Sequence, residues 1–92
     1  MNTKCNSNVS KAQALGLANY LMFLTKYHFN LSASENSCYV TIFFASHCEK
    51  VSLEYEIRNF LVDGCTTKTN YLEENDCYTY EIEYPCVFSR GL

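Results

Sequence analysis

The strictest pattern in this chain is an alternation of residue types close to its C-terminal end. Between Cys77 and Tyr84 every second residue is large and apolar, namely Tyr78, Tyr80, Ile82 and Tyr84. The residues between them are Thr79, Glu81 and Glu83. Successive side chains of a β-strand point to opposite faces, so this pattern predicts a strand with a buried tyrosine face and a solvated glutamate face. The chain must therefore build a sheet of which at least one face is covered.

This strand has a predicted partner immediately before it in the chain. Residues 66–73 are also compatible with a strand, and Asn75-Asp76 between the two segments tolerates the positive φ of a tight two-residue turn. Such a turn predicts a hairpin in which Tyr71 lies opposite Tyr80, Lys68 opposite Glu83, and Cys65 opposite Cys86. This register would make an aromatic pair, an ion pair and a cysteine pair, each of which favours pairing across strands.

The N-terminal half of the chain predicts a helix and then a strand. Apolar residues recur at helical spacing from Lys11 to Tyr27 or His28, and Ser10 with Gln13 has the form of a capping box. The core stripe comprises Ala14, Leu17, Ala18, Leu21 and Leu24. Residues 29–37 read as a polar connection. Residues 38–46, which are β-branched and aromatic at most positions, predict a central strand covered on both faces.

A second helix is predicted from Ser52 to about Leu61, with Gly64 as the residue that ends it. Its inward residues would be Leu53, Ile57, Phe60 and Leu61. The element order is then α-β-α-β-β, and the predicted class is α+β. We expect a small three-stranded sheet with a C-terminal antiparallel hairpin and both helices packed on one face. A right-handed crossover would join the first two strands, and the first strand could lie at the edge or in the centre.

Domain organisation follows from the length and the composition. At 92 residues the chain is expected to form one compact domain over 1–92, in which residues 1–9 are flexible. The apolar stretch from Ala12 to Leu24 is interrupted by polar residues and is too short to span a membrane. We interpret it as a folded helix and not as a removed leader, which predicts a cytoplasmic protein.

Charge is distributed unevenly between the two halves of the chain. Residues 1–50 carry four Lys or Arg against two Asp or Glu, whereas residues 51–92 carry three against eight. The acidic half disfavours direct binding to duplex DNA, and it suits a basic protein or complex as partner. The predicted partner-binding carboxylates are Glu73, Glu74, Asp76, Glu81 and Glu83.

Three apolar residues of the first helix lie off its core stripe. Leu15, Met22 and Phe23 widen the apolar arc beyond what one packing contact requires. We expect them to form a second contact face, either for a partner or for a further copy in a homodimer.

Motifs for chemistry are missing from the sequence. The six cysteines contain no close C-x₂-C pair, the three glycines are isolated, and His28 and His47 lack a local nucleophile signature. We therefore expect no enzyme activity, no cofactor and no metal. The thiols are expected to be reduced, and Cys65 with Cys86 is the best candidate if a disulfide forms.

These features predict a small non-enzymatic protein-binding inhibitor. Its size, acidity and lack of motifs suit a phage or mobile-element anti-defence protein, of anti-CRISPR or anti-restriction type, acting in the host cytoplasm. Such a protein would block a nucleic-acid-handling complex through its acidic surface. One alternative is a homo-oligomeric structural module joined through Leu15, Met22 and Phe23, and another is a secreted, disulfide-stabilised binding domain.

Overall fold

The protein folds as two helices on a four-stranded sheet. A computed structural model describes residues 5–85 and 87–88. The elements in chain order are β1 (Cys5–Asn6), α1 (Ser7–Leu24), β2 (His28–Ala33), β3 (Ser37–Phe44), α2 (His47–Glu56), the 3₁₀ turn η1 (Arg58–Phe60), β4 (Thr66–Leu72), β5 (Cys77–Pro85) and β6 (Val87–Phe88). Strand β1 pairs with β6, and the other four form an antiparallel sheet in the order β2-β3-β5-β4. The α+β class is confirmed, and the sheet has four strands instead of three.

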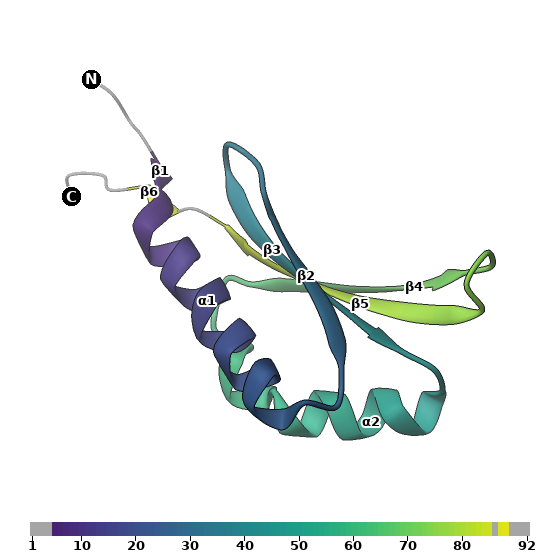
Figure 1. Ribbon diagram of the computed structural model, residues 1–92. Helices are drawn as coiled ribbons and strands as arrows, with labels where there is room; N and C mark the ends of the chain where they lie inside the picture. Colours follow the sequence, from purple (N-terminus) through teal and green to yellow (C-terminus); the bar gives the residue numbers. More distant parts are fainter. Residues whose placement is uncertain (1–4, 86, 89–92) are drawn as a thin grey trace.

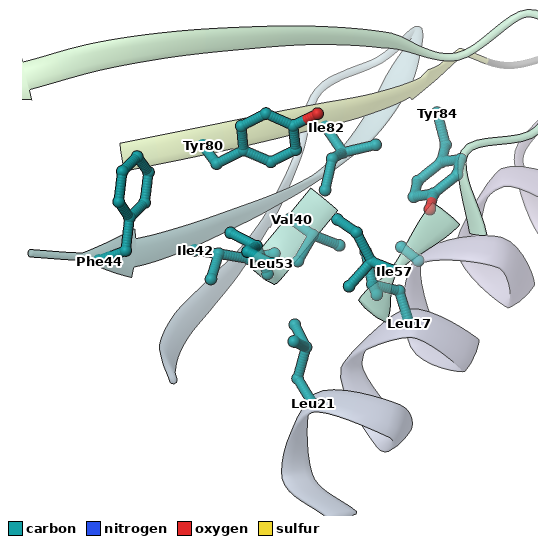
Figure 2. Packing of buried hydrophobic residues seen from close by; sticks show 11 residues of the cluster. Leu17, Leu21, Val40, Ile42, Phe44, Leu53, Ile57, Tyr80, Ile82 and Tyr84 are labelled. Carbon is teal, nitrogen blue, oxygen red and sulfur yellow. The ribbon is translucent and has the colours of Figure 1, made fainter. Parts of the chain in front are cut away.

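Both helices lie on the same side of the sheet, as predicted (Figure 1). Leu17 and Leu21 of α1 and Leu53 of α2 meet side chains of β3 and β5 in one apolar core (Figure 2). Strands β3 and β4 are parallel to each other, because each of them pairs antiparallel with β5, which lies between them. The segment containing α2 is therefore the crossover that the strand-helix-strand order predicted. Its length lets β5 insert between the two strands that it connects.

The sheet has one covered and one open face. Along β5 Tyr80, Ile82 and Tyr84 are buried, while Glu81 and Glu83 lie half-buried on the opposite face. The predicted sorting of tyrosines inward and glutamates outward is thus correct. Strand β3 corresponds to the first predicted strand, for which an edge or a central position was expected. It lies in the centre of the sheet. Its Tyr39, Thr41 and Phe43 remain partly exposed, however, so the expectation that both of its faces are covered was wrong.

Strand β2 was missed by the sequence interpretation, which placed a polar connection over residues 29–37. It pairs antiparallel with β3, with Phe29 opposite Ile42 and Leu31 opposite Val40. The signal was present, because apolar residues alternate with Asn30 and Ser32 from Phe29 to Ala33. The strand looks polar because it is an edge strand and keeps most of its residues exposed.

Helix α1 begins and ends several residues earlier than predicted. It starts at Ser7, so Ser10 is a buried residue of the helix and not its cap, and its hydroxyl donates to Cys38 Sγ at 3.6 Å. The helix ends at Leu24 because Thr25 adopts a left-handed conformation with φ of 56°. Of the predicted core stripe, Ala14, Leu17, Ala18 and Leu21 are buried, whereas Leu24 at the end of α1 is only half-buried. No helix of the described part of the chain is long and apolar enough to cross a membrane.

Helix α2 also begins earlier, at His47 instead of Ser52. Its N-cap is Ser46, whose hydroxyl accepts from the backbone N–H of Glu49, while the Glu49 carboxylate accepts from the N–H of Ala45 at 2.7 Å. The Ser-x-x-Glu spacing of residues 46–49 is a capping signal that the sequence contained. Gly64 has φ of 91° but does not end α2. It lies in the turn closed by the bond from Cys65 N–H to Val62 O, well after the helix.

The β4–β5 hairpin exists, but its register differs by two residues from the prediction. Tyr71 lies opposite Tyr78 and Lys68 opposite Glu81. The loop has four residues, 73–76, and of these only Asp76 has a positive φ. The predicted two-residue turn would have needed a positive φ at both Asn75 and Asp76. A shift of two residues keeps every side chain on its predicted face. Cys65 has a free thiol, and Cys86 lies outside the described residues.

Candidate functional site

The five carboxylates predicted to form one acidic surface belong to two separate places. Glu73, Glu74 and Asp76 lie in the loop at the tip of the β4–β5 hairpin, which projects away from α1 (Figure 1). Glu81 and Glu83 lie further along β5 on the open face of the sheet. A strand rises by about 3.3 Å per residue, so Glu83 is roughly 20 Å from the tip. We call residues 73–76 the acidic tip.

The acidic tip is built on a braced loop. The N–H of Asn75 donates to Leu72 O at 3.2 Å, and that of Asp76 donates to Glu73 O at 3.3 Å. Tyr71 donates its hydroxyl to Asp76 Oδ1 at 2.6 Å. This hydrogen bond to the carboxylate is the main reason that the pKa of Tyr71 is raised. The loop conformation is therefore fixed by both backbone and side-chain bonds.

Aromatic rings extend this bracing toward the core. The ring of Tyr71 lies 5.0 Å from that of Tyr78, and the Tyr78 ring stacks on Phe44 at 5.2 Å. His47 of α2 also belongs to this cluster, because its ring lies 5.3 Å from that of Tyr78. Contacts between aromatic rings at such separations stabilise the pair beyond simple burial. The tip is thus connected to the buried face of the sheet and not attached as a loose loop.

The three carboxylates of the acidic tip are alike in being exposed but differ in their hydrogen-bond partners. Glu73, Glu74 and Asp76 are all exposed. Asp76 accepts the bond from Tyr71, whereas Glu73 and Glu74 have no hydrogen-bond or ion-pair partner from a side chain of the described residues. No Lys or Arg occurs in the sequence between Lys68 and Arg90. Of the five predicted carboxylates, Glu73 and Glu74 are therefore the ones best placed to meet another molecule.

On the open face, Glu83 is committed to contacts within the sheet. Its carboxylate accepts the Ser37 hydroxyl at 2.6 Å, the Thr66 hydroxyl at 3.3 Å and the Tyr39 hydroxyl at 3.5 Å. Neighbouring Glu81 lies directly opposite Lys68 across the β4–β5 ladder. The acidic character of this face is therefore offset by Lys68 and by internal bonds. The structure does not bring Glu81 and Glu83 into one surface with the tip.

The predicted apolar contact face is divided as well. Leu15, Met22 and Phe23 are 43%, 64% and 80% exposed. Leu15 and Met22 are seven residues apart and so lie on the same flank of α1, whereas Phe23 points about 100° further round the helix. Leu15 lines a groove with Leu31 and Ala33 of β2. Leu31, which is 45% exposed, was not identified from the sequence because its strand was missed.

Cysteine, histidine and carboxylate side chains are the groups that metal binding or nucleophilic chemistry would use. Cys38, Cys48, Cys65 and Cys77 are free thiols, and burial raises the pKa of Cys65, which disfavours its reactive thiolate. His47 and Cys48, which directly follow the strand predicted over residues 38–46, lie in the first turn of α2. Within residues 5–85 and 87–88 no three His, Cys, Asp or Glu side chains gather as metal ligands would.

Comparison with known proteins gives no relative on which a function could rest. No protein-family model, no curated protein and no solved structure matches the chain.

Proposed function

We propose that this chain is a non-enzymatic protein-binding domain that uses its acidic tip to bind a basic surface of a partner. The observation that carries this proposal is the pair Glu73 and Glu74, exposed and without a side-chain partner in the described part of the chain, on a loop with fixed geometry. A rigid loop loses little conformational freedom on binding. The two negative charges at its end attract a positively charged surface over a distance.

The more specific form of this function is inhibition of a nucleic-acid-handling complex. Basic surfaces of such complexes bind phosphates, and carboxylates at the end of a projecting hairpin compete for the same cations. An anti-defence protein of a phage or mobile element, of anti-CRISPR or anti-restriction type, would act in this way. The free thiols of Cys38, Cys48, Cys65 and Cys77 favour a reducing compartment, which supports the cytoplasm over secretion.

The test is affinity capture from the native host with charge-reversed bait. We expect the variant Glu73→Lys/Glu74→Lys to retain less than about a tenth of the captured partner, because each reversal replaces attraction by repulsion at the contact. The single variant Glu74→Lys should show a smaller loss. Raising the salt concentration should weaken capture by the unmodified chain, since exposed charges are screened.

Asp63→Lys is the matched control for Glu74→Lys. Asp63 is an exposed carboxylate in the turn before β4, outside the tip, and its reversal changes the net charge by the same amount. Circular dichroism would show that all variants are folded. Equal capture by folded tip variants and control would rule out the acidic tip as the binding site. Equal loss from the tip variant and Asp63→Lys would mean that only net charge matters.

A further inference from the structure

Among the described residues, strand β2 has a partner strand on one side only, so a row of its backbone groups is left without a partner strand. The Ser34 N–H donates to Ser37 O at 2.8 Å across the turn, which makes these two residues a hydrogen-bonded pair. Hydrogen-bonded and non-hydrogen-bonded pairs alternate along an antiparallel ladder. With the observed β2–β3 register, Asn30 and Ser32 therefore direct their backbone groups toward β3. The backbone groups of Phe29, Leu31 and Ala33 consequently point to the open edge of the sheet.

Nothing in β2 itself prevents a further strand from pairing there. The strand His28-Phe29-Asn30-Leu31-Ser32-Ala33 contains no Asp, Glu, Lys, Arg or Pro, and its pairing with β3 is continuous without a bulge. Charged residues, prolines and bulges are the usual means by which edge strands avoid pairing with other chains. The opposite edge strand, β4, differs, because it carries the charged residue Lys68. The β2 edge is thus open to pairing.

An apolar groove runs beside this edge on the helix-covered side. Its lining includes Leu15 and Lys11 of α1 and Leu31 and Ala33 of β2, and it has a volume of about 400 Å³. Leu15 and Leu31 are each nearly half exposed, and Met22 continues the same flank of α1. The edge backbone and the exposed apolar flank therefore lie next to each other and can be covered by one partner.

We propose that β2 pairs antiparallel with β2 of a second copy, so that two four-stranded sheets form one continuous sheet across a twofold axis. The register that uses the open groups places Leu31 opposite Leu31 of the second copy and Phe29 opposite Ala33. Asn30 then lies opposite Ser32. Phe29, Leu31 and Ala33 become hydrogen-bonded pairs, each exchanging two bonds, as their outward backbone groups require.

A second copy fits this surface better than an isolated extended peptide. A single added strand would satisfy the backbone but would leave Leu15 and Met22 exposed, because they rise above the sheet on α1. A second copy brings its own α1 to the opposite side of the axis, where the two exposed flanks face each other. No charge of β2 opposes its own copy. Lys11 lies near the Ala33 end of β2, so the twofold axis separates the two Lys11 side chains.

The test compares oligomeric state between the unmodified chain and charge variants of residue 31. Sedimentation should show the unmodified chain as a dimer at micromolar concentration. Leu31→Lys and Leu31→Glu should each raise the dimer dissociation constant at least about tenfold, because like charges would lie directly opposite on the axis. An equimolar mixture of the two variants should form a heterodimer, because lysine then faces glutamate.

Thr69→Lys is the matched control. Thr69 is exposed on the same face of the sheet as Leu31 but on β4, the other edge strand, so this variant should remain dimeric. Circular dichroism would confirm that each variant is folded. A monomeric unmodified chain overturns the proposal and leaves a partner's extended strand as the occupant of this edge. Folded Leu31 variants that stay dimeric, or that fail to associate when mixed, overturn it as well.

Discussion

The two faces of the sheet are built from the same strands but stabilise the fold by different interactions. On the helix-covered face, Val40, Ile42 and Ile82 are completely buried and belong to one apolar cluster with side chains of both helices. On the open face, Glu83 accepts hydroxyl groups from neighbouring strands, among them Ser37 and Thr66. Alternate residues of β5 therefore contribute by two different mechanisms, namely apolar burial and polar bonding across strands.

This difference shows where the molecule is available for binding. The covered face is occupied by its own helices, and part of the polar capacity of the open face is used by contacts with Glu83. The acidic tip and the β2 edge, in contrast, present exposed groups without partners in the described part of the chain. Both lie at the periphery of the sheet, where a partner is met without disturbing the core. The comparison of the faces can be tested with neighbouring residues of β5.

The largest expected effect is that of Ile82→Ala. Ile82 is fully buried in the centre of the core, so its truncation removes apolar burial and leaves a cavity. We expect a loss of about 3 kcal/mol in the free energy of unfolding. The adjacent Glu81→Ala, on the open face, should cost less than about 1 kcal/mol. Urea denaturation of both variants measures the difference, and similar losses would contradict the assignment of the two faces.

A somewhat smaller effect is expected from alkaline pH through Tyr84. Burial raises the pKa of Tyr84 to about 12 from the ordinary value of 10.0. The unfolded chain therefore loses this proton first, and the free energy of unfolding should fall by about 2 kcal/mol as pH rises from 10 to 12. Below pH 10 this contribution is fully present.

Tyr84→Phe provides the control for this pH dependence. The Tyr84 hydroxyl donates to Phe60 O at 2.7 Å, so the variant should lose about 1 kcal/mol at neutral pH. Above pH 10 its stability should fall less steeply than that of the unmodified chain. Tyr80, whose pKa burial also raises, retains a part of the slope. Identical pH dependence in the two proteins would show that Tyr84 does not titrate as its burial implies.

The smallest of the three effects is expected for Glu83→Ala on the open face. This change leaves the buried Ser37 hydroxyl without its acceptor, which we expect to cost about 1 kcal/mol. Glu83→Gln, which keeps an acceptor oxygen, should recover part of the loss. Thermal unfolding of the two variants provides the measurement. If Glu83→Ala were as stable as the unmodified chain, the contacts of Glu83 would not contribute to folding, and Glu83 would again be a candidate for partner binding.

Much of the fold was predictable because several elements carry complete local signals. The alternation along residues 77–84 and the helical stripe of Ala14, Leu17 and Leu21 each bury one face, and both were correctly assigned. The site was predicted only in part. Glu73 and Glu74 are exposed as expected, but the sequence gives no indication that Glu83 accepts bonds from Ser37, which is distant along the chain. The edge strand β2 and the cap Ser46 had local signals that were misread.

Residue periodicity was sufficient to predict which side chains face the core, because it is a local property that a register shift of two residues leaves unchanged. Which strands are neighbours, and in which register they pair, depends on contacts between segments that are distant in the chain. Strand β5 lies between β3 and β4, and Tyr71 lies opposite Tyr78, because the four-residue loop and the packing of distant segments fix these relations. For the same reason only the tertiary structure separates the tip carboxylates from Glu81 and Glu83 and leaves β2 at an open edge.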